Sequence, residues 1–206
     1  MRPKLAITSH VFGESGGALG IACDADGCHA IDVRIDARDL LGVTDLATDL
    51  RARAARDVEL RYHYPIRGQE EICSADASIA DAALADLLGV IDRVAALSAA
   101  YLTVHLPMAS DANAVQVAGA RSRLAEAVAH ARSLGITLCL ENLRWGLTSD
   151  PDVLLQLADA TGAALTIDIG HAASSEFVER GVTAADVVRI AGERVRNAHV
   201  YEREDP

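Results

Sequence analysis

Polar residues of the kinds that bind metals and move protons recur at the ends of short apolar runs in this chain. They are His63, His105, Glu141, Asp168 and His199, with His171 three residues after Asp168. Carboxylate oxygens and imidazole nitrogens together hold divalent cations such as Mn²⁺, Zn²⁺, Co²⁺ or Mg²⁺. A mixed set that leaves positions open for substrate is typical of a catalytic metal site. The sequence therefore predicts a divalent metal ion held by Glu141, Asp168 and His199.

Each of these residues also has an ordinary structural explanation when it is taken alone. A histidine such as His63 or His105 at a strand end is commonly hydrogen-bonded within the core. A buried carboxylate is commonly half of an ion pair, for which Arg61 or Arg144 is available, and Asp168 is able to open a turn. The joint occurrence favours the metal site, because burying this many polar groups is costly without a compensating ion.

Short β-rich runs that alternate with longer helical stretches must position these residues. The runs are Lys4–His10, His29–Ile35, Val58–Tyr64, Tyr101–Leu106, Ile136–Glu141, Ala164–Ile169 and Val195–Tyr201. Ile79–Ser98 and Ala114–Leu134 repeat apolar residues at helical spacing. Ser149-Asp-Pro-Asp is typical of a helix start, and Thr183-Ala-Ala-Asp has the spacing of a capping box. The alternation predicts βαβ units and a parallel sheet.

The strand sequences alternate between an apolar face and a face that becomes polar toward the carboxyl end. In Ile136–Glu141, the side chains of Thr137, Cys139 and Glu141 oppose three apolar ones. Strands of a doubly wound sheet are covered on both faces and are apolar throughout. The alternation therefore favours an α/β fold of the (β/α)8 TIM-barrel type, whose inner face opens into a site at the carboxyl ends of the strands.

The length of the chain sets an expectation for how complete this barrel is. Only seven strands are countable in 206 residues, whereas a full barrel typically has about 250 residues. We expect one domain over residues 1–206, a TIM barrel that lacks the eighth strand or is truncated there. An unpaired edge strand invites pairing, so a homodimer is a further expectation.

Composition narrows the class of partner. A formal net charge of −11 repels a phosphate backbone and anionic membrane surfaces, and no Lys/Arg stripe offsets it. No segment approaches the roughly 18 apolar residues that span a bilayer, and no secretory leader is apparent. The four cysteines form no CxxC pair, which is typical of reduced thiols in a cytoplasmic protein. The partner expected is a small molecule.

Three motifs carry a resemblance to a known family. Leu140-Glu141-Asn142, Asp168-Ile-Gly-His171 and Ala198-His199-Val200, in this order, resemble the xylose isomerase-like TIM-barrel superfamily. The similarity covers essentially the whole chain. The superfamily contains sugar and sugar phosphate isomerases and epimerases, inosose dehydratases and apurinic endonucleases. The resemblance implies that Glu141, Asp168 and His199 bind the metal, that His171 contacts substrate or another metal, and that His63 and His105 line the pocket or hold a further metal.

The resemblance implies a metal-dependent isomerase or epimerase acting on a sugar, a sugar phosphate or a related polyhydroxy carbonyl compound. The reaction would pass through a metal-stabilised enediolate. Glu141 and His171 would be the catalytic residues. Glu141, or a neighbouring carboxylate, would move the proton on the carbon next to the carbonyl, and His171 would position a substrate oxygen. Trp145 would form an apolar wall against the carbohydrate substrate, and His63 and His105 would line the substrate pocket.

Two departures from the family pattern keep other functions open. The family's epimerases use a fourth ligand, a Glu on the eighth strand, and this sequence ends before that point. Its endonucleases carry an Asp-x-His pair after the seventh strand, where this sequence has Glu202-Arg-Glu-Asp205. The alternatives are a metal-dependent phosphodiester hydrolase of the apurinic endonuclease type, disfavoured by the acidic charge, and a non-catalytic barrel that binds a small molecule.

Overall fold

The strands form one parallel sheet whose spatial order follows the chain. The computed structural model describes residues 6–8, 30–34, 52, 54, 58–64 and 70–200. The strands are β1 (Ala6–Thr8), β2 (Ala30–Arg34), β3 (Glu59–Tyr64), β4 (Ala99–Val104), β5 (Thr137–Glu141), β6 (Ala164–Asp168) and β7 (Val195–His199). Each strand pairs in parallel with the next, in the order β1 to β7. The predicted parallel sheet is thereby confirmed.

Helices connect the strands and begin at polar capping residues. They are α3 (Ala77–Ala95), α4 (Ala114–Ser133), α5 (Pro151–Thr161), α6 (Ile169–Ala173) and α7 (Ala184–Ala191), with short 3₁₀ turns at η3 (Glu70–Cys73), η4 (Leu147–Ser149), η5 (Val178–Arg180) and η6 (Gly192–Arg194). Thr183 caps α7 in the capping box predicted from its sequence. Asp150 caps α5, directly before the proline of its first turn. Local side-chain chemistry therefore fixes where these helices start.

Hydrogen bonds across the sheet show that it is rolled into a partial barrel. Nη1 of Arg61 on β3 donates to Oδ1 of Asn197 on β7 at 3.0 Å. Oγ1 of Thr103 on β4 lies 2.8 Å from Oγ1 of Thr166 on β6. In a flat sheet, β3 and β7 would be separated by about 19 Å, because neighbouring strands lie about 4.8 Å apart. The fold is a partial (β/α) TIM barrel with a polar interior, which confirms the predicted fold class.

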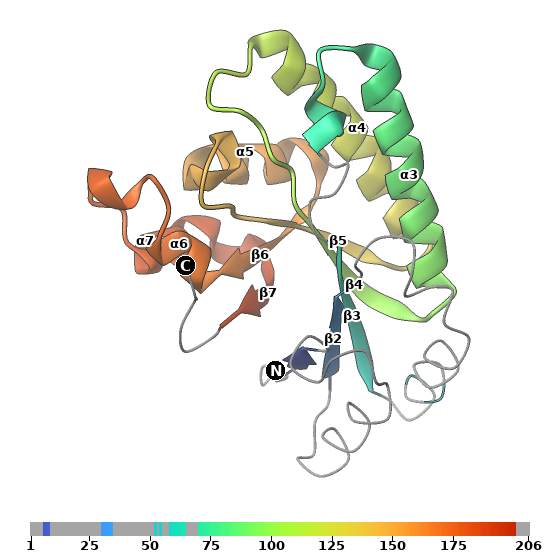
Figure 1. Cartoon of the computed structure of the whole chain (residues 1–206). Helices are drawn as coiled ribbons and strands as arrows, with labels where there is room; N and C mark the ends of the chain where they lie inside the picture. Colours follow the sequence, from blue (N-terminus) through green and yellow to red (C-terminus); the bar gives the residue numbers. More distant parts are fainter. Residues whose placement is uncertain are drawn as a thin grey trace.

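The hydrophobic core lies between the outer face of the sheet and the helices. Figure 1 shows α3 and α4 side by side along one side of the strands. On β3, alternate side chains are buried: Leu60, Tyr62 and Tyr64. The residues between them, including His63, face the barrel interior, where Arg61 and His63 make their contacts. Burying a large apolar side chain contributes about 1.5–3 kcal/mol, so the outer face fixes which side chains point inward.

Membrane-spanning helices and the state of the cysteines can be examined only in the described residues. Of the helices that the structure describes, none is long and apolar enough to cross a membrane. Cys73 and Cys139 are buried free thiols, whereas Cys23 and Cys28 lie outside the described residues.

Candidate metal centre

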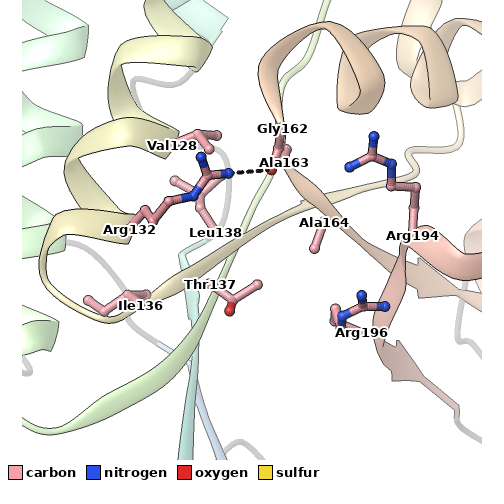
Figure 2. Close-up of a pocket in the computed structure, with 10 residues that line it drawn as sticks. All are labelled: Val128, Arg132, Ile136, Thr137, Leu138, Gly162, Ala163, Ala164, Arg194 and Arg196. Atoms are coloured by element: carbon pink, nitrogen blue, oxygen red, sulfur yellow. Dashed lines mark hydrogen bonds between the residues drawn. The ribbon is translucent and has the colours of Figure 1, made fainter.

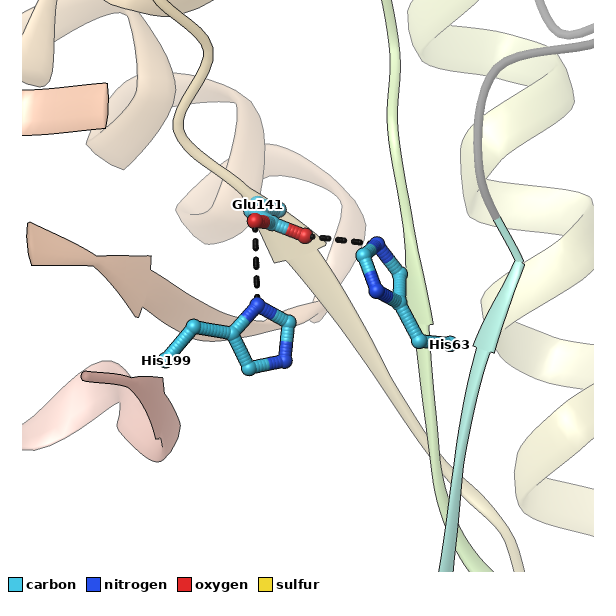
Figure 3. A group of neighbouring side chains, drawn as sticks. All are labelled: His63, Glu141 and His199. Carbon is cyan, nitrogen blue, oxygen red and sulfur yellow. Dashed lines mark hydrogen bonds and ion pairs between the residues drawn. The ribbon is translucent and has the colours of Figure 1, made fainter. Parts of the chain in front are cut away.

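The carboxylate of Glu141, the last residue of β5, is the centre of the polar cluster. Its side chain is fully buried, with 0% of its surface exposed. Oε2 lies 3.0 Å from Nε2 of His63 and 3.0 Å from Nε2 of His105. Oε1 lies 3.1 Å from Nδ1 of His199 and 3.6 Å from Nδ1 of His171. Figure 3 shows His63 next to one oxygen of the carboxylate and His199 next to the other.

Asp168, the last residue of β6, brings a second carboxylate to the same place. Oδ1 accepts a hydrogen bond from the backbone N–H of His171 at 2.7 Å and so caps α6. Oδ2 lies 3.8 Å from Nδ1 of His199 and 3.9 Å from Nδ1 of His171. One oxygen therefore holds the following turn while the other faces the imidazoles.

Asn142 locks the ends of β5 and β6 together. Its Nδ2 donates to the backbone oxygen of Asp168 at 3.0 Å, and its Oδ1 accepts from the Asp168 backbone N–H at 2.8 Å. The backbone oxygen of Asn142 lies 2.9 Å from Nδ1 of His171. Asn142 is part of the sequence motif but was not predicted to have a role. In the structure, its hydrogen bonds to the Asp168 backbone hold the Glu141 and Asp168 carboxylates next to each other.

The structure brings the predicted polar residues together in two overlapping donor groups. One group contains His63, Glu141 and His199, and the other contains Glu141, Asp168 and His171; within each, the ligand atoms lie within 4.8 Å of one another. Glu141 belongs to both groups. The predicted ligand set takes Glu141 from both, His199 from the first and Asp168 from the second. Which of these residues bind an ion stays a prediction.

Trp145 lies four residues after Glu141, in the segment between β5 and η4. Half of its surface is exposed. Its predicted role as an apolar wall for substrate stays a prediction.

Burial and hydrogen bonding act in opposite directions on the charges of the site. Burial raises the pKa of Glu141, but hydrogen bonds from three of the surrounding histidines outweigh it and hold this pKa well below its ordinary value. Burial lowers the pKa of His199, but hydrogen bonds to Asp32 and Glu141 raise it to about 10. Without a metal ion, both ring nitrogens of His199 are therefore protonated at neutral pH, and the imidazole is positively charged.

The chemistry of the donor atoms fits a divalent cation. Among the described residues, the ion-pair partners of Glu141 are all histidines. Arg61, an alternative ion-pair partner in the sequence, instead bonds to Glu59 and Asn197. Nδ1 of His105 is buried without a hydrogen-bond partner. Carboxylate oxygens and imidazole nitrogens gathered around a buried point match the ligands of Mn²⁺, Co²⁺ and Zn²⁺.

Asp32, in the middle of β2, was missed by the sequence reasoning. Its Oδ2 lies 3.3 Å from Nε2 of His199. Burial raises the pKa of Asp32, but the hydrogen bond and charge of His199 outweigh it, so the pKa is lowered. The strand alternation of His29–Ile35 was the available signal, because Asp32 is a carboxylate between two apolar residues.

A separate pocket lies at the opposite end of the strands. Figure 2 shows this pocket, about 200 Å³ in volume, which includes the first residues of β5 and β6. Three arginines line it, and each donates to a protein oxygen: Arg132 to the Gly162 backbone, Arg194 to the Asp159 carboxylate, and Arg196 to the backbone of Glu193 and Val195. The pocket is therefore distinct from the Glu141 cluster, and its guanidinium groups already have partners.

Comparison with known proteins gives one family. The family model described as xylose isomerase-like TIM barrel matches residues 21–204. An uncharacterized protein of Methanocaldococcus jannaschii is 39% identical over 70 residues, which are 34% of this chain and 29% of that protein. This match thus spans less than a third of the archaeal relative.

Solved structures share the fold over most of the chain. L-ribulose 3-epimerase matches with a TM-score of 0.77 and 20% identity, over 96% of this chain and 69% of that one. A Thermus thermophilus protein, soaked with ZnCl₂, matches with a TM-score of 0.64 and 25% identity, over 83% of this chain and 68% of that one. At such identities, the likeness to the epimerase establishes the architecture.

Proposed function

Because this chain belongs to the xylose isomerase-like TIM-barrel family, we propose that it is a metal-dependent isomerase or epimerase of a sugar or related polyhydroxy carbonyl compound. The observation that carries the proposal is the fully buried Glu141 carboxylate, to which the carboxyl ends of the strands bring four imidazoles and the carboxylate of Asp168. The structural likeness to an enzyme named L-ribulose 3-epimerase supports a ketose as the substrate class.

The proposed metal ligands are Glu141, Asp168 and His199. A bound divalent cation would supply positive charge next to the carbonyl and hydroxyl oxygens of the substrate, where negative charge develops during proton transfer. Support comes from the mixed oxygen and nitrogen donor set. That a similar protein was soaked with ZnCl₂ makes zinc one ion to test.

Glu141 is proposed to move the proton on the carbon next to the substrate carbonyl. Its lowered pKa keeps the carboxylate ionised at neutral pH, which both a ligand and a proton acceptor require. Nδ1 of His171 lies 3.6 Å from Oε1 of the same carboxylate, and His171 is proposed to hold a substrate oxygen. His63 and His105 meet on the other carboxylate oxygen, with their Nε2 atoms 2.9 Å apart, and are proposed to contact substrate hydroxyl groups.

The test is proton exchange at carbon in deuterated water. Wild-type protein with Mn²⁺, Co²⁺ or Zn²⁺ should incorporate deuterium next to the carbonyl of a ketopentose or ketohexose, as followed by NMR, and form its epimer, as followed by chromatography. Glu141→Gln should lower the rate by about 10²–10⁴-fold, whereas Glu126→Gln, on the exposed face of α4, should not. Full activity in Glu141→Gln would remove this residue from the mechanism.

A second candidate function is phosphodiester hydrolysis, which one feature favours. The two donor groups share Glu141, as in sites where one carboxylate serves two metal ions that clamp a phosphoryl group. The net charge of −11 opposes a nucleic-acid substrate. A nicking assay on abasic-site DNA with Zn²⁺ or Mn²⁺ separates the two functions. A protein that binds none of these ions would instead support a non-catalytic barrel.

A further inference from the structure

Asp32 directs its carboxylate to the one histidine of the proposed ligand set. Its Oδ2 lies 3.3 Å from Nε2 of His199, although β2 and β7 are not neighbours in the sheet. Asp32 is only 8% exposed, so water screens this contact weakly. The pair therefore depends on the rolling of the barrel, which brings the two strands face to face.

The two ring nitrogens of His199 face different carboxylates. Nδ1 faces Oε1 of Glu141 at 3.1 Å, and Nε2 faces Asp32. A histidine binds a metal through one nitrogen, and the hydrogen bond made by the other nitrogen decides which tautomer is present. We propose that Asp32 is a positioning residue that keeps the His199 proton on Nε2, so that the lone pair of Nδ1 points into the metal centre. This inference rests on the proposed metal centre.

Asp32 is itself held in place by a directional chain of hydrogen bonds. Arg61 donates through Nη1 to Oδ1 of Asn197 at 3.0 Å. Because a guanidinium only donates, the amide oxygen of Asn197 must face it. The Nδ2 of Asn197 then faces Asp32 and donates to Oδ2 at 3.4 Å. The chain of partners from β3 through β7 to β2 thus fixes the orientation of the Asp32 carboxylate.

Substituting Asp32 by asparagine tests the role without changing the shape of the side chain. Because the Nδ2 of Asn197 donates to the same Oδ2 that faces His199, the asparagine must keep its amide oxygen at that place. A neutral amide oxygen accepts the Nε2–H bond more weakly than a carboxylate does, which makes Nδ1 of His199 a weaker ligand. Removing such a partner of a metal-binding histidine weakens metal binding by about 10–100-fold. The matched control is Asp92→Asn, because Asp92 pairs with His130 at 2.7 Å on the exposed side of α3 and α4.

The experiment measures the Kd for Zn²⁺ and Mn²⁺ by calorimetry in wild-type, Asp32→Asn and Asp92→Asn protein. We expect binding by Asp32→Asn to be about 10–100-fold weaker and binding by Asp92→Asn to equal that of the wild type. Nitrogen-15 correlation NMR of zinc-loaded wild-type protein gives a second readout that needs no variant. It should show the His199 proton on Nε2.

The outcomes separate the two levels of the proposal. Equal Kd values for wild-type and Asp32→Asn protein would overturn the role of Asp32 and leave the metal centre intact. A His199 proton found on Nδ1 in the zinc-loaded wild type would do the same. If the wild-type protein binds neither ion, the metal centre falls and the role of Asp32 falls with it.

Discussion

The pH dependence of folding stability should reveal the protonation of His199, whose imidazole lies between the carboxylates of Asp32 and Glu141. In metal-free protein, the folded pKa of His199 is about 10, compared with 6.5 in the reference state. Between these values, the folded protein keeps a proton that the unfolded chain has released. The free energy of unfolding therefore falls as pH rises, by up to about 1.4 kcal/mol per pH unit for one proton. Below pH 6.5 the contribution is fully present.

The assay compares wild-type and His199→Gln protein in EDTA by urea unfolding at several pH values between about 7 and 9. The stability difference between the two should shrink by about 3 kcal/mol over this range. Glu141 and Asp32 have lowered pKa values, so they titrate below this range and do not contribute to the slope. The control is His130→Gln, which removes another histidine–aspartate pair, the one with Asp92 on the exposed surface.

A difference that stays constant over this pH range would refute the claim that His199 is protonated in the folded protein. Should His199→Gln fail to fold, the ring proton of His199 in wild-type protein still gives the answer by NMR. Its chemical shift should titrate with a midpoint near pH 10. A midpoint near the ordinary histidine value of about 6.5 would contradict the expected pairing with both carboxylates.

Three other outcomes follow from the same structure. Because a ligand histidine must lose its proton, the affinity for Zn²⁺ should rise about tenfold per pH unit from pH 6.5 toward about 9, and His199→Gln should abolish this slope in calorimetry. Gly146→Ala should lower the free energy of unfolding by about 2 kcal/mol or more in urea, because Gly146 has φ +76° and a Cβ would meet the Met108 carbonyl. Gly135→Ala is the control: Gly135 has φ +79° but open space around it, so the substitution should cost about 1 kcal/mol. Cys139, whose thiol pKa burial raises to about 12, should resist iodoacetamide at about pH 8 until the protein unfolds, as mass spectrometry would show.

The presence of each strand was predictable, because apolar and polar residues alternate within it, but the first and last residues of the strands were not. The run Tyr101–Leu106 was predicted as a strand, whereas β4 is Ala99–Val104 and His105 lies just beyond its end. The parallel pairing of Leu60 with Ala99 sets the start of β4, and a contact between strands leaves no mark in the strand sequence itself. His105 still reaches Glu141, because a one-residue overhang keeps it at the same edge of the barrel.

The predicted cluster consists of residues at the carboxyl ends of strands, so the prediction did not include inward-facing residues deeper in the barrel. Asp32 and Asn197 lie within β2 and β7, one layer deeper in the barrel. Their contact joins residues 165 positions apart in the chain, so it exists only once the sheet has rolled. Strand alternation identifies such residues as inward-facing, but it cannot say which inward-facing partners they meet.

The deeper layer explains how this site tolerates its own charge before a metal ion binds. Two buried carboxylates, Asp32 and Glu141, flank His199, and both have lowered pKa values. The hydrogen bond and charge of His199 lower the pKa of Asp32, whereas hydrogen bonds from His105, His199 and His63 lower that of Glu141. Burying charge without compensation is costly, so the proton on His199 stabilises the fold in the place where the cation is proposed to bind. A cation at the proposed site would compete with the proton for Nδ1 of His199, while Asp32 would face Nε2 in both states. By this argument, substitutions in the pair of His199 and Asp32 should change both the stability of the metal-free protein and its affinity for the metal ion.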